Sequence, residues 1–233
     1  AKYGYGNIGK VLAVLFAILC IGGSFGGGNM FQANQAYAQL SGQFPMLSGN
    51  GPMFGFLLAI LVGTVIIGGI KSIARVTEKI VPFMAVLYVA AALVILVVNF
   101  SEIGNAFALI FKGAFAPSAA FGGFIGVIIQ GFRRAAFSNE AGVGSASIAH
   151  SATKTNEPVS EGIVSLLEPF IDTVVICTMT ALVIIIFNSS GAFLYGGEGG
   201  VMIDGVMYEG AGITAKAFDQ YIPGSEYFLT TAV

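Results

Sequence analysis

Charged residues are scarce in this sequence. Asp, Glu, Lys and Arg together make up 9% of its 233 residues, whereas hydrophobic residues make up 56%. Soluble globular domains carry about 25% charged residues, so the shortage of charge excludes a soluble protein and indicates an integral membrane protein. The formal net charge of −2 also excludes a nucleic-acid-binding protein, because such a protein needs a basic surface.

Tryptophan is absent, and histidine and cysteine are rare. Without tryptophan, any aromatic belt at the membrane surface must come from tyrosine and phenylalanine. Cys20 and Cys177 lie in apolar runs, where we expect inert buried thiols. With one histidine, no cluster of metal ligands and no Ser-His-Asp spacing, the sequence argues against an enzyme and predicts no cofactor.

The apolar runs are long and almost unbroken, and they predict an all-α membrane protein. Transmembrane strands are short and alternate apolar with polar residues, which these runs do not. We expect about five full transmembrane helices and the start of a sixth. The expected apolar segments cover residues 7–40, 53–70, 80–100, 121–150 and 161–187, and the chain stops in FLTTAV.

The connecting segments have distinct characters. Residues 71–79 and 151–161 are expected to be charged loops, and residues 101–118 a short amphipathic helix at the membrane surface. VMIDGVMYEG (201–210) predicts a hairpin with Asp204-Gly205 at its turn. GITAKAFDQYIPG (212–224) predicts a short helix stopped by Pro223.

Lysine and arginine indicate the orientation of the chain. Lys71, Arg75, Lys79 and Lys154 occupy alternate loops, which the positive-inside rule places in the cytoplasm. The sequence therefore predicts a multi-pass protein of the cytoplasmic membrane. Because it lacks an initiator methionine and a signal-peptide pattern, we expect residues 1–233 to be one transmembrane domain, an internal fragment partnered by the remainder of the same polypeptide and by the lipid bilayer.

One expected span contains a polar interruption. Within residues 121–150, the stretch FSNEAGVGSASIAH (137–150) brings together Ser138, Asn139 and Glu140, followed by glycines. Amides and charges are costly in hydrocarbon, and glycine weakens a helix. Where a span carries such residues, the backbone is expected to unwind and line a polar cavity.

Such a break would leave two helix ends facing each other inside the membrane. Free carbonyl groups at one end attract a cation or an ammonium group, and free N–H groups at the other attract a carboxylate. Together they suit a zwitterion bound beside a cation. Hard oxygen ligands suit a sodium ion, and Ser138, Asn139, Asp172 and Thr173 carry such oxygens.

Other polar residues allow two interpretations each. Gln32 shares a helix face with Asn29 and Gln35, so these amides either line a cavity or form hydrogen bonds between helices. Glu140 either pairs with a nearby arginine or lies on an ion pathway. His150 is expected to be a solvated or capped residue at the cytoplasmic end of its segment, with a proton relay as the alternative.

Four separated motifs resemble one known family. They are GNMFQANQ, GGIKSIARVTEKIVPFMAVLY, FSNEAGVGSASIAHSA and FIDTVVICTMTALVI, and the resemblance extends from about residue 8 to the end. The sequence resembles the alanine or glycine:cation symporters, which are sodium-coupled amino-acid transporters of the LeuT-type fold. The resemblance implies two inverted repeats of five helices, of which this chain would supply the third to seventh helices, the sixth being discontinuous, and the start of the eighth.

The resemblance also implies roles for individual residues. Phe137 would wall the side-chain pocket, and the two glycines would allow close approach of the substrate. The implied substrate-binding residues are Gln32, Phe137, Ser138, Asn139, Gly142 and Gly144. The implied sodium ligands are Ser138, Asp172 and Thr173, and Arg133 and Arg134 would form an outer gate. The first two helices, one of which carries the other half of the site, are absent, as are the helices that follow the eighth.

The function implied is sodium-coupled symport of a small neutral amino acid, such as alanine or glycine, by alternating access. The polar residues cluster at one depth and do not follow several helices, which favours an occluded site over a channel. The alternatives are a passive channel, a structural subunit of a membrane complex, and a proton-coupled amino-acid transporter.

Overall fold

The computed structural model describes residues 6–25, 29–115, 128, 146–195, 200–225 and 227. Most of these residues are helical, as predicted for an all-α membrane protein. The helices are α1 (Gly6–Phe25), α2 (Phe31–Gln43), α3 (Gly51–Ile66), α4 (Gly69–Val98), α5 (Phe100–Ala114), α8 (Ala146–His150), α9 (Pro158–Pro169), α10 (Cys177–Phe187) and α11 (Ala211–Tyr221). Shorter elements are the 3₁₀ turns η2 (Pro45–Leu47) and η4 (Asn188–Ser190), the π-helix η3 (Phe170–Ile176), and strands β1 (Leu194–Tyr195), β2 (Val201–Ile203) and β3 (Val206–Tyr208).

Three helical segments of the described part are long and apolar enough to cross a membrane. They are Gly6–Phe25, Gly69–Val98 and the continuous run Pro158–Ser190. α3 is apolar but shorter, with 16 residues. Most of the expected span 121–150 lies outside the described residues, so the number of spans stays a prediction.

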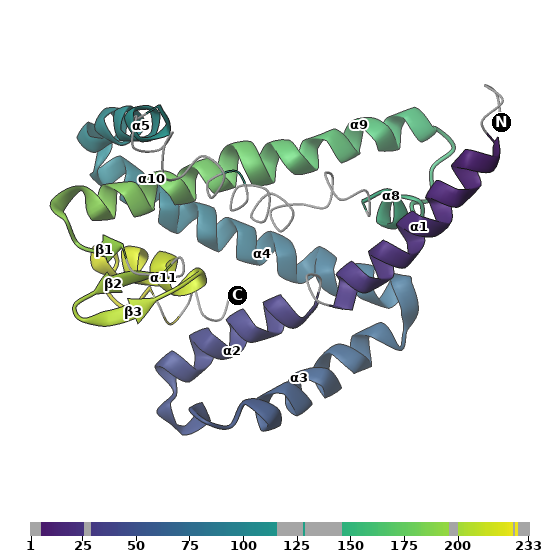
Figure 1. Ribbon diagram of the computed structural model, residues 1–233, viewed down its shortest axis with the longest axis horizontal. Helices are drawn as coiled ribbons and strands as arrows, with labels where there is room; N and C mark the ends of the chain where they lie inside the picture. The colour runs from purple at the N-terminus through teal and green to yellow at the C-terminus, as the bar shows by residue number, and fades with distance from the viewer. Residues whose placement is uncertain are drawn as a thin grey trace.

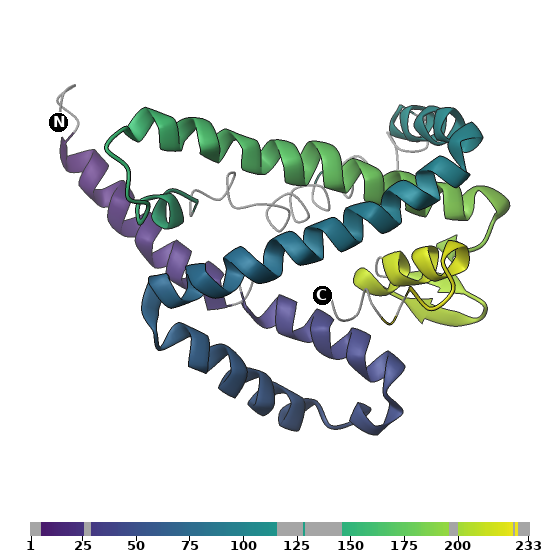
Figure 2. The same ribbon diagram turned by 180° about the vertical axis from the view of Figure 1, so that it is seen from behind.

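α4 is the central element of the arrangement. The run α9–η3–α10 lies along one side of it, and α2 and α3 lie on the other (Figures 1 and 2). α4 packs on both α10 and α3. Its residues Ala91, Ala92, Ile95 and Leu96 are buried at the end that meets α10.

Residues 71–79 are part of α4, so the prediction of a loop there is wrong. The helix runs unbroken through Lys71, Arg75 and Lys79, and Pro82 lies inside it. Lys, Arg and Glu are strong helix formers. These charged residues therefore lie just before an apolar stretch, but they do not end the helix.

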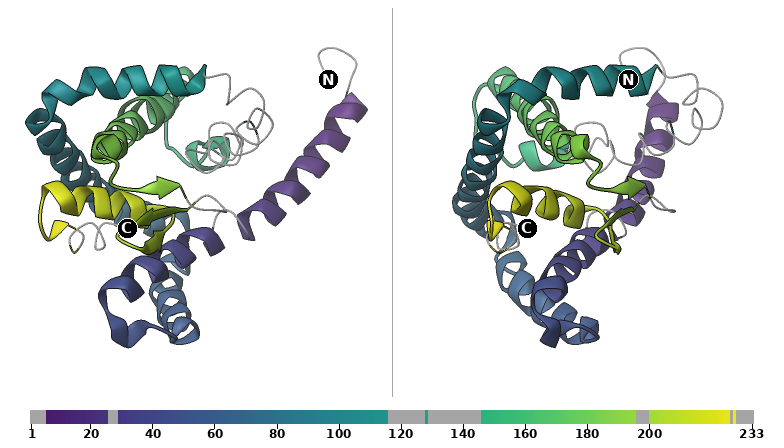
Figure 3. Two further views of the ribbon diagram at one scale, coloured as in Figure 1. Left: turned by 60° about the vertical axis from the view of Figure 1, so that its left-hand side comes forward. Right: turned by 90° about the vertical axis from the view of Figure 1, so that its left-hand side faces the viewer.

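α5 confirms the short amphipathic helix that the sequence predicts. Glu102 lies in its first turn and Lys112 in its last, where each charge complements the helix dipole. Ala106 is buried against the core, whereas Phe107 and Phe111 are exposed. Figure 1 shows α5 end-on while α10 runs across the view, and Figure 3 shows α5 from the side. α5 thus crosses the direction of the long helices.

Strands β1, β2 and β3 and helix α11 form a small unit, the cap, at one end of the long helices (Figure 1). β2 and β3 pair antiparallel through Met202 and Met207. The hairpin turn is the predicted one, because Asp204 (φ 52°) and Gly205 (φ 79°) both adopt the positive φ that a type I′ turn requires. α11 ends at Tyr221, two residues before Pro223, as predicted.

The core lies where the cap meets the long helices. α11 packs on α10, α4 and α2. Phe218 of α11 is fully buried, and its ring centroid is 5.3 Å from that of Tyr88 on α4. Val183 and Ile186 of α10 are buried in the same cluster. The cap is therefore held mainly by apolar contacts with helices from distant parts of the sequence.

Candidate substrate and ion site

Most of the residues predicted to bind substrate lie outside the described part of the chain. This holds for the predicted substrate contacts and for the predicted gate: Phe137, Ser138, Asn139, Gly142, Gly144, Arg133 and Arg134. Glu140 lies there too. Their roles therefore stay predictions, and the described residues contribute Gln32, Asp172 and Thr173.

Asp172 and Thr173 lie in the π-helix η3, between α9 and α10. The backbone N–H of Cys177 donates to the carbonyl oxygen of Asp172, five residues earlier, which is the π-helical pattern. Pro169 immediately precedes η3. Because proline lacks an N–H and crowds the preceding turn, Pro169 weakens the last turn of α9, immediately before η3.

The wide turn of η3 carries two side chains with hard oxygen atoms, within a helical run that is long and apolar enough to cross a membrane. Asp172 is half-buried and Thr173 is exposed. A carboxylate, a hydroxyl and the carbonyl groups of a widened turn are the kinds of ligand that a sodium ion takes. No group of three or more His, Cys, Asp or Glu side chains that could hold a metal lies among the described residues.

Gln32 is not packed near η3. It is exposed on α2, which packs on α3 and α11, whereas η3 packs on α9 and α10. The described residues therefore do not bring this predicted substrate contact beside the predicted ion ligands.

Gln35, one turn along α2, connects that helix to the cap. Its Oε1 atom accepts a hydrogen bond of 3.3 Å from the backbone N–H of Ala211, the first residue of α11. Of the two interpretations of the amide row, hydrogen bonding between helices is therefore confirmed at Gln35. Gly210 makes this close approach possible, because its φ is +52° and an added Cβ would overlap Gln35 Oε1.

Gly210→Ala is expected to weaken the docking of the cap on α2. The backbone at Gly210 (φ 52°, ψ −124°) is one that residues with a Cβ rarely adopt, at a cost of about 1–3 kcal/mol. The apparent melting temperature of the purified protein should fall. Gly104→Ala is the matched control, because Gly104 lies in α5 with open space around it and alanine is the better helix former. Equal melting temperatures for both variants would contradict the assignment.

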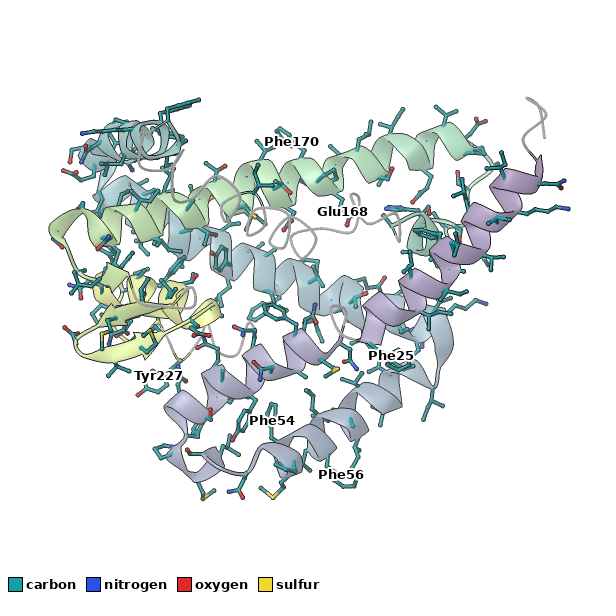
Figure 4. All side chains as sticks on the ribbon, viewed as in Figure 1. Phe25, Phe54, Phe56, Glu168, Phe170 and Tyr227 are labelled. Carbon is teal, nitrogen blue, oxygen red and sulfur yellow. The ribbon has the colours of Figure 1, made fainter. Side chains whose placement is uncertain are left out.

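His150 is partly exposed, as expected of a solvated histidine, and it also contacts two carboxylates. Nδ1 lies 2.6 Å from Oε1 of Glu161, and Nε2 lies 3.4 Å from Oε2 of Glu168. Thr153 Oγ1 also donates to Glu161 Oε1, at 3.2 Å. Figure 4 shows Glu168 on the side of α9 where α8 lies, whereas Phe170 points away from it. These contacts bind the end of α8 to one face of α9.

The two carboxylates raise the pKa of His150 above its ordinary value of 6.5, Glu161 contributing more than Glu168. A group with a raised folded-state pKa stabilises the fold below its unfolded pKa, and this stabilisation is lost as the pH rises through the folded pKa. The contact between α8 and α9 is therefore strongest in acid, below about pH 6.5.

Tyr88 and Thr180 form a hydrogen bond that the sequence does not predict. Thr180 Oγ1 donates to the carbonyl of Ile176 at 2.8 Å, so the Tyr88 hydroxyl donates to Thr180 Oγ1. The bond joins α4 to α10 directly beneath Phe218 of the cap. Each of the two residues is recognisable in the sequence as a polar residue in an apolar run. They are 92 positions apart, however, so the sequence does not indicate that they pair.

Comparison with known proteins gives a consistent result. The model of the sodium:alanine symporter family matches residues 3–233. The chain is 44% identical over 219 residues to the sodium/alanine symporter AgcS of Methanococcus maripaludis, covering 93% of this chain and 45% of that protein. It is 36% identical over 202 residues to the putative sodium/proton-dependent alanine carrier protein YrbD of Bacillus subtilis, covering 83% and 40%. To the probable sodium/glutamine symporter GlnT of the same organism it is 42% identical over 137 residues, covering 58% and 29%.

The chain spans less than half the length of these curated relatives. The match nevertheless extends over almost the whole of the chain, including α2, α4 and the run α9–η3–α10. Together with helices that are apolar enough to cross a membrane, it confirms the family resemblance read from the four motifs: this chain belongs to the sodium:alanine symporter family.

Proposed function

We propose that the protein carries out sodium-coupled symport of a small neutral amino acid across the cytoplasmic membrane by alternating access. Membership of the sodium:alanine symporter family supports this proposal. The observation that carries it is the position of Asp172 and Thr173 in a widened turn within the spanning run Pro158–Ser190. A carboxylate is costly inside a membrane, and a functional role is the usual reason for one.

In the transporter we assign this chain to the third to seventh helices of a LeuT-type fold, with residues 121–150 as the discontinuous helix. Half-helix ends at such a break favour a zwitterion, which is the form of a neutral amino acid at physiological pH. The proposed substrate contacts are Gln32, Phe137, Ser138, Asn139, Gly142 and Gly144. The proposed sodium ligands are Ser138, Asp172 and Thr173, and the proposed gate is Arg133 and Arg134.

Proton coupling is the second candidate, beside or in place of sodium. Two relatives are named as sodium/proton-dependent alanine carriers, from Bacillus subtilis and Bacillus sp.. The position of His150 between two carboxylates favours this candidate, because histidine and carboxylate chains in membranes relay protons.

The deciding experiment measures alanine uptake by the full-length protein in proteoliposomes. Uptake is compared with an inward sodium gradient, an inward proton gradient, both, or neither, and protein-free liposomes give the background. We expect alanine to accumulate above its external concentration only when a sodium gradient is present. Uptake that follows the proton gradient alone would favour the second candidate, and uptake indifferent to both gradients would indicate a passive channel and contradict symport.

A further inference from the structure

We propose that His150, Glu161 and Glu168 form a proton-binding site, and that a proton bound there weakens sodium binding at the wide turn that holds Asp172. The first half of this proposal stands on the geometry of the three side chains. The second half rests on the proposed function, because it takes Asp172 as a sodium ligand.

The geometry around the imidazole favours an additional proton. An ionised carboxylate has only acceptor atoms, and a neutral imidazole has one N–H donor. Carboxylate oxygens face both ring nitrogens of His150, at 2.6 Å and 3.4 Å. Both contacts are favourable only if the imidazole is doubly protonated or if one carboxylate carries the proton. In both cases the cluster carries one proton more than it would with a neutral imidazole and two ionised carboxylates.

The side chains of the cluster are partly open to solvent, least so at the tighter contact. The side chains of His150 and Glu161 are 25% and 19% exposed, whereas Glu168 is 41% exposed. The only other side chain with a hydrogen bond to the cluster, within the described part of the chain, is Thr153, which is neutral. Within the described part of the chain, Glu161 and Glu168 form ion pairs with the imidazole and with no lysine or arginine.

The two glutamates of this cluster and the proposed ion site lie on the same helical run. Glu161 and Glu168 are seven residues apart and contact the same imidazole, so they share a face of α9. Asp172 follows Glu168 by four residues, one turn further along. Four residues rise by at most about 6 Å along a helix axis, so Glu168 and Asp172 lie on adjacent turns. This rise is comparable to the screening length of about 8 Å at physiological salt.

The charge of the cluster therefore affects a cation bound at Asp172. With His150 protonated, its positive charge offsets part of the charge of the two glutamates. With His150 neutral, both glutamates attract a nearby cation without this offset. Sodium binding and proton binding then oppose each other, and the effect must be reciprocal.

The proton site is tested by nitrogen NMR of the full-length protein labelled in histidine. The difference between the spectra of the unmodified protein and His150→Gln identifies the His150 imidazole. We expect its titration midpoint to lie above 6.5 and to move downward in Glu161→Gln. Glu157→Gln is the matched control, since it removes a carboxylate at the start of α9, whereas the contacts of the imidazole within the described structure are with Glu161 and Glu168. It should leave the midpoint unchanged. A midpoint at or below 6.5, or one insensitive to Glu161→Gln, would overturn the proton site.

The link to sodium is tested by binding of radioactive sodium to the same proteins at a series of pH values. We expect the dissociation constant for sodium to rise by about fivefold as the unmodified protein is acidified through the midpoint found by NMR. In His150→Gln this dependence should be lost, and in Glu157→Gln it should persist. An equal dependence in His150→Gln would overturn the link. Failure to bind sodium at any pH would overturn the proposed function and the link together, whereas the NMR titration decides the proton site separately.

Discussion

Asp172→Asn is expected to reduce the apparent sodium affinity of the full-length transporter by at least a factor of about 10–100. This factor is the usual cost of disturbing groups that only orient a metal ligand, and Asp172 is proposed as a ligand itself. The variant keeps the size of the side chain and one carbonyl oxygen, but it removes the negative charge from the wide turn of η3. The measurement is the initial rate of alanine uptake as a function of external sodium.

Asp204→Asn is the control for this experiment. Asp204 lies in the hairpin turn of the cap with φ 52°, and asparagine tolerates this conformation at least as well. It therefore removes one carboxylate from the protein without disturbing the spanning helices, and uptake should keep its sodium dependence. An Asp172→Asn variant that is inserted normally and retains the sodium dependence of the unmodified protein would remove Asp172 from the ion site.

Phe218→Ala is expected to have the largest effect on stability. The side chain is fully buried between α11 and the long helices, against Tyr88. Truncating a buried phenylalanine costs about 3–5 kcal/mol through lost burial and the cavity left behind. Opening of the cap should become more frequent by a factor of roughly 100–4,000, because each 1.4 kcal/mol is a factor of ten. Hydrogen–deuterium exchange of the α11 amides, followed by mass spectrometry, measures this opening directly.

Phe100→Ala separates this effect from a general loss of apolar surface. Phe100 is the first residue of α5 and is 76% exposed, so its truncation should change stability by no more than about 0.5 kcal/mol. Exchange in α11 should then match that of the unmodified protein. If Phe218→Ala leaves α11 exchange unchanged, the cap is held by contacts other than this ring.

The sequence was most informative where local chemistry decides the structure. The turn at Asp204-Gly205 was predictable because few residues accept positive φ. The end of α11 was predictable because proline cannot continue a helix. α5 was predictable because the apolar run in this segment is too short to span a membrane.

The sequence was least informative about contacts between distant segments. The contacts of His150 with Glu161 and Glu168 depend on how the chain folds back after α8, which local propensity does not determine. The prediction of a loop at residues 71–79 is wrong for another reason: a group of charged residues does not by itself end a helix, and α4 continues through it. For the candidate site, Asp172 and Thr173 were found from their polarity within an apolar run, but the π-helix around them was not.

The wide turn of η3 also determines how the two halves of its long helix face their surroundings. A π-helical turn contains one residue more than an α-helical turn, so it rotates everything beyond it by about 100° relative to an unbroken α-helix. Before the turn, Glu161 and Glu168 face His150; after it, Val183 and Ile186 face the core beneath the cap. Loss of one residue between Phe170 and Ile176 would restore a regular helix and turn one of these faces away from its partner. A related sequence with a one-residue gap at this position is therefore expected to have a different angle, about the helix axis, between the carboxylate face and the apolar face.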